Sequence, residues 1–192
     1  MKSLPFRFDA ATHRYLDLAT GAELPHITGL LNVSGWVDDA FFTEESCARG
    51  QAVHKLTADY DLGALDVASC VSRYRGWLLG HVTVAGIVRP EWLHVETPAV
   101  HPRYRFGGRP DRVGVIYGCR GVFEVKSGVP TRGHQIQTAL QAILVADELE
   151  LPAHAVERFA EYLNDQGKYK IERHVERRDF DEALRILKRY AS

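Results

Sequence analysis

Hydrophobic and polar residues alternate at the start of the chain and then recur at helical spacing. Residues 6–24 alternate between apolar and polar positions around turn residues, which predicts two or three short antiparallel strands. Residues 26–36 predict a short helix ended by Gly35. Apolar residues then recur every three to five positions from 38 to about 62, which predicts a longer helix that carries His54.

The middle of the chain changes from a helical pattern to a strand pattern. Residues 64–80 predict a second helix. Residues 92–101, 104–118 and 120–128 are rich in β-branched and aromatic residues and are punctuated by Gly and Pro, so they predict strands. The segment 117–121, YGCRG, predicts a hairpin loop between the last two of these strands.

The last third of the chain predicts helix, hairpin and helix. Residues 131–151 have apolar side chains at helical spacing, and residues 155–175 predict a hairpin that turns at 164–167. Residues 179–191 predict an amphipathic helix with Asp179 as its N-cap. This order of elements predicts an α/β fold, with a mixed central sheet flanked by α-helices.

Length and composition favour one soluble domain. The chain has 192 residues, of which 45% are hydrophobic and 26% charged, so we expect a single globular domain over residues 1–192. The first residues include Pro, Arg, Asp and His before any long apolar run, which is not typical of a signal or transit peptide. No apolar run reaches the length of a membrane-spanning helix, so the expected location is cytoplasmic, with no membrane partner.

Cysteine usage and charge narrow the possible cofactors and partners. Three widely spaced cysteines without a CxxC pair argue against an iron–sulfur cluster. The net charge is −1, but residues 101–135 hold seven cations against two anions. The cations are Arg103, Arg105, Arg109, Arg112, Arg120, Lys126 and Arg132. This window is either a solvated sheet edge or a surface that binds phosphates.

Two charged residues interrupt the apolar strand predicted at 120–128. Glu124 and Lys126 lie two positions apart, so their side chains point to the same face of the strand. If the preceding strand pairs with it through the hairpin loop, Asp111 lies near Glu124. Two carboxylates at one buried site need a cation between them, and oxygen ligands suit Mg²⁺ or Mn²⁺. Alternatively, Glu124 and Lys126 form an exposed ion pair and Asp111 starts a turn.

Five short segments occur in an order that resembles a known enzyme family. They are ARGQAVHKL (48–56), HVETPAV (94–100), GGRPD (107–111), FEVKSG (123–128) and HQIQTALQ (134–141). Together they resemble the PD-(D/E)XK nuclease superfamily in its RecB-like exonuclease branch. The resemblance implies a restriction-endonuclease-like core that binds Mg²⁺ or Mn²⁺.

The resemblance also assigns roles to individual residues. Asp111 and Glu124 would be carboxylate metal ligands, His54 an imidazole ligand, and the backbone carbonyl of Val125 a further ligand. Lys126 would be the catalytic lysine, placed to orient the attacking water or to stabilise charge on a phosphate.

Four positions on neighbouring elements have accessory roles in this interpretation. Gln137 would orient Lys126 or contact the DNA backbone, and Glu96 would assist the metal site. Gln141 and His134 stand where the family often has tyrosines, and they share a helix face with Gln137.

Contacts with DNA are expected from the basic window. Arg109, Arg112 and Arg132 would bind phosphates on either side of the scissile bond. Tyr104 and Phe106 would stack on an unpaired base.

The expected function is that of a metal-dependent deoxyribonuclease, preferably an exonuclease or end-processing enzyme acting on DNA that is single-stranded or has free ends. No GxxxxGK[ST] motif occurs, so no nucleotide cofactor is expected. An endonuclease remains an alternative. A catalytically inactive nucleic-acid-binding module, or an interaction protein in which the ion pair is structural, also remains open.

Overall fold

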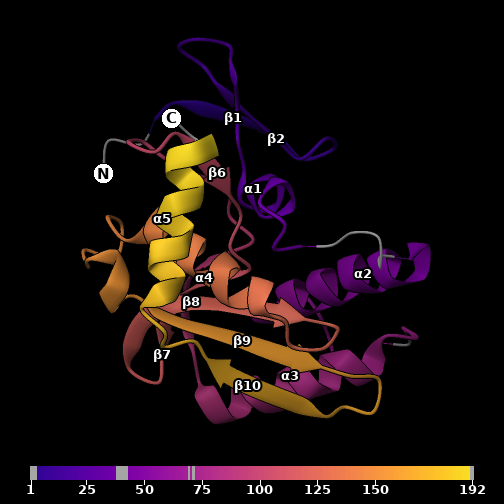
Figure 1. The fold of residues 1–192 in the computed structure, drawn as a ribbon. Helices are drawn as coiled ribbons and strands as arrows, with labels where there is room; N and C mark the ends of the chain where they lie inside the picture. The colour runs from indigo at the N-terminus through magenta and orange to yellow at the C-terminus, as the bar shows by residue number, and fades with distance from the viewer. Residues whose placement is uncertain (1–3, 38–42, 69, 71, 191–192) are drawn as a thin grey trace.

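The computed structural model describes residues 4–37, 43–68, 70 and 72–190 (Figure 1). It confirms the α/β fold, with a mixed five-stranded sheet flanked by helices. In chain order the elements are β1 (Phe6–Asp9), β2 (Arg14–Asp17), β3 (Glu23–Leu24), α1 (Ile27–Val33), α2 (Glu44–Asp61), α3 (Arg75–Val88), β4 (Glu91–Val95), β5 (Ala99–His101), β6 (Phe106–Gly108), β7 (Arg112–Ile116), β8 (Cys119–Lys126), α4 (Arg132–Val145), the 3-10 helix η2 (Ala153–Ala155), β9 (Glu157–Leu163), β10 (Tyr169–Arg173) and α5 (Arg178–Tyr190).

The central sheet has the strand order β10-β9-β8-β7-β4. The pairs β4–β7, β7–β8 and β9–β10 are antiparallel, whereas β8 and β9 pair in parallel. A parallel pair needs a long crossover, and α4 provides it by covering one face of the sheet. The small sheet β1-β2-β3 lies above the central sheet in Figure 1, and the sheet β5-β6 contacts α1 and α4.

A tight turn joins β7 to β8 and sets their register. Ile116 pairs with Cys119, so the loop consists of Tyr117 and Gly118, both with positive φ of 51° and 78°. Two such residues form the hairpin turn whose twist matches that of the strands. The predicted hairpin is confirmed, but β8 begins inside the predicted YGCRG loop.

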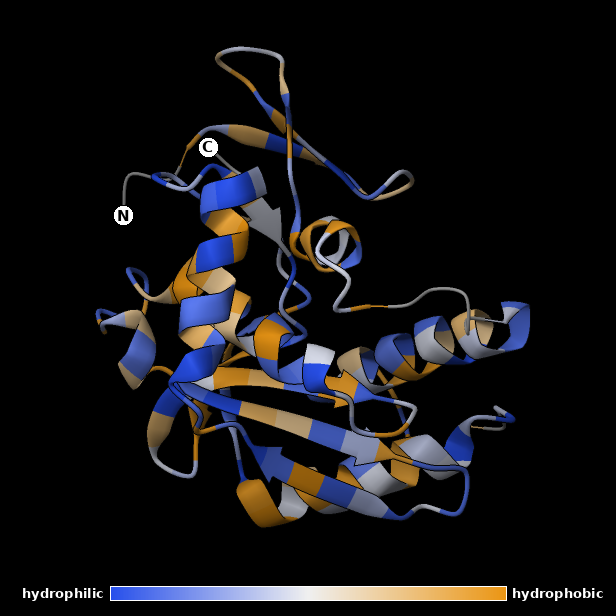
Figure 2. Cartoon of the chain, in the orientation of Figure 1, coloured by the Kyte–Doolittle hydropathy of each residue, from blue (hydrophilic) through white to orange (hydrophobic). Residues whose placement is uncertain are grey.

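Helices cover the two faces of the sheet in layers. On one face, α4 packs between the sheet and the helices α1 and α5, and buries Ile136, Leu140 and Leu144. Helix α5 turns its hydrophobic side toward α4 and its polar side outward (Figure 2). On the other face, α3 buries Val84 and Val88 against the sheet. Strand β8 therefore has a layer of helices packed on each of its two faces.

The second predicted helix was wrong in its bounds. Helix α3 begins at Arg75, and the described part of residues 64–74 is not helical. Two polar side chains bind backbone amides there, since Asp66 Oδ1 accepts from the amide of Ala68 and Ser72 Oγ from that of Tyr74. Such local bonds favour turns over helix. The apolar residues after Arg75 instead continue the helix to Val88.

The predicted strands 92–101 and 104–118 were wrong as single strands, because the first divides into β4 and β5 and the second into β6 and β7, which belong to different sheets. The remaining predicted elements are confirmed with shifted ends. The three N-terminal strands, the short α1 and the β9–β10 hairpin form as expected. Helix α2 begins at Glu44 behind a capping box made by Thr43, and the predicted start at 38–42 lies outside the described residues. Helix α4 ends at Val145, earlier than predicted. Among the described helices, none combines the length and the apolar character needed to cross a membrane.

Asp179 does not cap the last helix as predicted. It lies within α5, is fully buried, and binds Arg158 and Arg132 at 3.0 and 2.5 Å. Two guanidinium groups therefore hold its carboxylate inside the domain, where it ties α5 to β9 and to the start of α4.

Candidate metal centre and catalytic cluster

Three metal-ligating side chains meet at one end of the sheet. His54, Glu96 and Asp111 each offer a ligand atom, and these atoms lie within 4.8 Å of one another. His54 Nδ1 is 3.1 Å from Asp111 Oδ1 and 3.4 Å from Glu96 Oε1. The three residues are 15 to 57 positions apart in the sequence, so only the tertiary fold brings them together.

Each of the three sits on a separate element. His54 projects from the middle of α2, and Glu96 directly follows β4 with a positive φ of 50°. Asp111 directly precedes β7, and its carbonyl accepts a bond from the Glu96 amide at 2.9 Å. Asp111 Oδ2 accepts from the Val125 amide at 2.7 Å. The Glu96 amide thus fixes the main chain of Asp111, and the Val125 amide of β8 fixes its carboxylate.

A second cluster of side chains surrounds Glu124 on β8. Lys126 Nζ donates to Glu124 Oε1 at 2.7 Å and to Gln137 Oε1 at 3.0 Å. Gln137 Nε2 also donates to Glu124 Oε1, and Gln141 Nε2 donates to Glu124 Oε2 at 2.6 Å. Gln137 and Gln141 are one turn apart on α4, so they face the strand together.

Burial and neighbouring charges shift the pKa values in both clusters. The charge of Asp111 raises the pKa of His54 to about 10, against an opposing effect of burial. Burial raises the pKa of Asp111, but His54, Lys126 and Arg112 outweigh it and lower it to about 2. Burial and then the charge of Asp111 raise the pKa of Glu124. Asp111 therefore keeps its negative charge at neutral pH.

The donor set fits a divalent cation. Two carboxylates and one imidazole offer oxygen and nitrogen ligands, and carboxylates suit Mg²⁺ and Mn²⁺. Asp111 is 4% exposed, so its negative charge needs a cationic partner. A protonated His54 or a metal ion can provide it.

The predicted ligands are only partly brought together. His54 and Asp111 meet as expected, but the third member of the cluster is Glu96 rather than Glu124. Glu124 is instead bound through both oxygens by Lys126 and the two glutamines of α4. Val125 meets Asp111 through its amide, and the ligand role of its carbonyl stays a prediction.

The accessory residues predicted on α4 make three different contacts. The contact between Gln137 and Lys126 is confirmed, and Gln141 reaches Glu124. His134 lies on the same helix, and its Nδ1 is 3.1 Å from the Tyr162 hydroxyl.

The predicted phosphate contact of Arg112 was wrong. Its side chain is fully buried, and it binds Asp61 Oδ2 at 2.5 Å, Thr57 Oγ1 at 3.2 Å and the Asp111 carbonyl at 2.7 Å. The guanidinium therefore supports the chain behind Asp111 and does not reach the surface. Arg109 and Arg132 keep about a third of their side chains exposed, and both pair with carboxylates, at Glu96 and Asp179 respectively.

The predicted base-stacking residues also need correction. Phe106 is fully buried and stacks on His101, so it is part of the core. Tyr104 packs against the same core from its edge, with the Arg103 guanidinium 5.7 Å from its ring.

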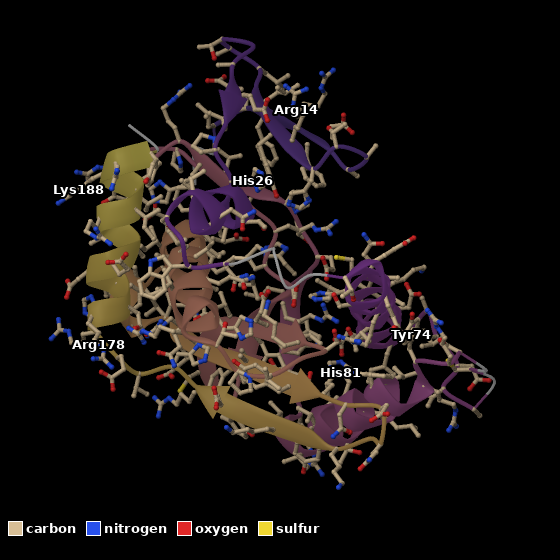
Figure 3. All side chains as sticks on the ribbon, turned by 45° about the vertical axis from the view of Figure 1, so that its right-hand side comes forward. Arg14, His26, Tyr74, His81, Arg178 and Lys188 are labelled. Atoms are coloured by element: carbon tan, nitrogen blue, oxygen red, sulfur yellow. The ribbon has the colours of Figure 1, made fainter. Side chains whose placement is uncertain are left out.

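The sequence did not reveal a buried network of charged side chains that lies behind the site. His81 Nδ1 lies 2.7 Å from Glu161 Oε2, and its Nε2 lies 3.0 Å from Asp61 Oδ2, the oxygen that Arg112 also binds. His81 projects from α3 (Figure 3). It sits within an apolar helical run, so the sequence carries no signal of its two carboxylate partners.

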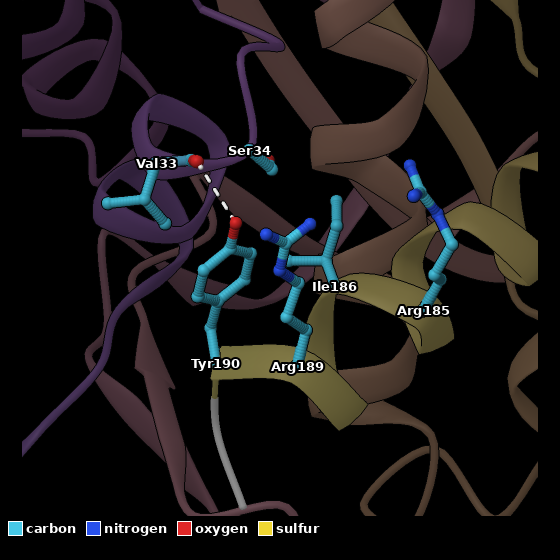
Figure 4. A pocket seen from close by; sticks show the side chains of 6 residues that line it. All are labelled: Val33, Ser34, Arg185, Ile186, Arg189 and Tyr190. Carbon is cyan, nitrogen blue, oxygen red and sulfur yellow. Dashed lines mark hydrogen bonds between the residues drawn. The ribbon is translucent and has the colours of Figure 1, made fainter.

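Two surface hollows of about 300 Å³ each lie elsewhere. One is formed by α1 and α5, where Arg185 and Arg189 project and the Tyr190 hydroxyl donates to the Val33 carbonyl at 3.3 Å (Figure 4). The other lies beside η2, against Tyr104 and Phe180. Neither contains a residue of the two clusters.

Comparisons with known proteins add no relative. No protein-family model matches the chain, and no curated protein matches it.

Proposed function

We propose that this protein is a divalent-metal-dependent nuclease that hydrolyses phosphodiester bonds of DNA, with an exonuclease or end-processing activity preferred. The observation that carries the proposal is that the His54, Glu96 and Asp111 cluster adjoins Lys126 through the backbone of β8. The mixed sheet is compatible with the restriction-endonuclease-like core implied by the resemblance to PD-(D/E)XK nucleases.

Each side chain of the two clusters has its own role in this proposal. His54, Glu96 and Asp111 would hold Mg²⁺ or Mn²⁺, which when bound polarises a phosphoryl oxygen and lowers the pKa of water. Lys126 is 17% exposed and would bind the attacking water or a phosphate oxygen. Gln137 and Glu124 hold the Lys126 ammonium in place through bonds of 3.0 and 2.7 Å. The bonds from Gln141 and Gln137 in turn fix Glu124.

The test is cleavage of labelled DNA by matched variants. Single- and double-stranded DNA labelled at the 5′ or 3′ end is incubated with Mg²⁺, Mn²⁺ or EDTA. We expect metal-dependent cleavage, and a loss of roughly a hundredfold or more in Lys126→Ala. Lys55→Ala is the matched control, because Lys55 is an exposed residue of α2 whose ammonium pairs only with Asp59 among the ion pairs of the described residues.

Two results would overturn this proposal. Cleavage that persists in EDTA would show that the reaction does not need a metal ion. Equal activity of the two lysine variants would show that Lys126 takes no part in catalysis. The product ladder also distinguishes an exonuclease, which shortens one labelled end progressively, from an endonuclease.

One observation favours a second candidate, an inactive module on the same fold. Both oxygens of Glu124 are already bound by neighbouring side chains, as in a structural ion pair. This candidate predicts that the protein binds DNA but does not cleave it with either metal, and that Lys126→Ala changes stability alone.

A further inference from the structure

Aromatic rings gather on the N-terminal sheet next to the candidate metal centre. Phe8, His13, Tyr15 and His26 form a chain of contacts, with ring centroids 4.8 Å apart for Phe8 and Tyr15, 5.4 Å for Phe8 and His13, and 5.2 Å for His13 and His26. Tyr15 is fully buried beneath the other three, which are partly exposed. Figure 3 places His26 at the base of this sheet. We call Phe8, His13 and His26 the aromatic platform.

The platform is held rigidly against the strand that leads to Asp111. The Gly107 amide donates to the Pro25 carbonyl at 2.8 Å, and His26 forms a bridge with Gly107. Gly107 has no side chain, and a Cβ there would lie 2.4 Å from the Tyr15 ring. Close packing at Gly107, four residues before Asp111, therefore fixes the sheet relative to the metal centre.

Arg109 connects the platform to the metal centre. Its Nε lies 3.1 Å from Glu96 Oε2, and its Cζ lies 5.8 Å from the centre of the Phe8 ring. One guanidinium group thus separates the Phe8 ring from the cluster of metal ligands. Arg105, on the turn before β6, binds Asp17 of β2 at 2.6 Å and is 43% exposed. Cationic groups and aromatic faces therefore occur together on this side of the site.

Uncharged rings suit stacking on a nucleobase. Burial lowers the pKa of both His13 and His26, so these rings are neutral at physiological pH. Successive bases of single-stranded nucleic acid stack on such aromatic faces while arginines bind the phosphates. A paired base in a duplex already has both faces covered by its neighbours.

We propose that the aromatic platform binds an unpaired base of single-stranded DNA beside the phosphate that enters the metal centre. The Phe8 ring stacks on the base, and the rings of His13 and His26 flank that base. Arg109 binds the adjoining phosphate. This inference rests on the proposed nuclease function and extends it to a preference for single strands. It assigns to the N-terminal sheet the role that the sequence had suggested for Tyr104 and Phe106.

Binding of short fluorescent oligonucleotides tests the platform apart from cleavage. Fluorescence anisotropy is measured with Mg²⁺ on the full chain carrying Lys126→Ala, and gels verify that the DNA stays intact. Phe8→Leu keeps an apolar side chain but removes the ring, and we expect about a tenfold or greater loss of affinity for single strands. Phe6→Leu is the matched control, because Phe6 lies on the same strand and also packs on Tyr15, with ring centroids 6.2 Å apart.

A single abasic position in the oligonucleotide identifies stacking directly. We expect the abasic position to weaken binding only when it stands at one or two places along the strand. Phe8→Leu should abolish this loss of affinity, since the base and the ring act as one pair. If Phe8→Leu proves unfolded, His13→Asn replaces it, because asparagine tolerates the positive φ of 54° at this position.

The outcomes separate this inference from the proposed function. Absence of single-strand binding, equal losses in Phe8→Leu and Phe6→Leu, or an abasic penalty unchanged by the variant would each overturn the platform. Absence of cleavage by the unmodified chain would overturn only the nuclease function. A Phe8-dependent abasic penalty would support the platform in either case.

Discussion

The network of His81, Asp61, Glu161 and Arg112 makes the stability of the protein depend on pH. Burial alone lowers the pKa of His81, but its bonds to the two carboxylates outweigh burial and raise it from 6.5 to about 9. A shift of this size corresponds to about 3 kcal/mol in favour of the protonated, folded form. The stabilisation is fully present below pH 6.5 and is lost as the pH rises through about 9.

Urea unfolding of the chain and of His81→Gln measures this contribution. Glutamine stays neutral, so the difference in unfolding free energy between the two proteins isolates the histidine charge from other titrating groups. We expect this difference to be largest below pH 6.5 and to shrink by about 3 kcal/mol above pH 9.

The control is His94→Gln. His94 pairs with Glu148 near the surface, where an ion pair contributes about 1 kcal/mol or less. A constant difference between the chain and His81→Gln across the whole pH range would refute the reasoning, because His81 would then be neutral in the folded protein.

Three further substitutions have expected effects on the free energy of unfolding, measured in urea. Arg112→Met leaves buried carboxylates without their guanidinium and should cost about 3 to 5 kcal/mol, whereas a neutral effect would mean that the network carries no net stability. Gly107→Ala places a methyl group against Tyr15 and should cost about 1 to 3 kcal/mol, while Gly86→Ala, in open space on α3, should be neutral or stabilising; equal effects would contradict this. Gln141→Leu removes a donor from a buried carboxylate oxygen and should cost about 1 to 3 kcal/mol, and an unchanged midpoint would show that another donor replaces it.

The sequence predicted most of the helices and strands of the chain. Alternation and helical spacing are local properties, so the strands around Phe123 and the helix through Gln137 could be identified without the structure. The pairing of Glu124 with Lys126 also followed from strand geometry, because residues two apart share one face of a strand. The non-helical conformation of the described residues between 64 and 74 was missed because side-chain bonds to the backbone compete with an apolar pattern.

Only the tertiary structure decided which charged groups share a buried space. The positions of α2 and of the bend after β4 bring Glu96 to His54 and Asp111, while Glu124 turns toward α4. Arg112 lies next to Asp111 in the chain, yet its buried guanidinium binds Asp61 and Thr57 of α2 and does not reach the surface. Distances between charges depend on how helices pack on the sheet, which is a non-local property of the chain. For this reason the sequence indicated two members of the candidate metal cluster, His54 and Asp111, but its third member Glu96 and the buried charge network behind it depend on packing.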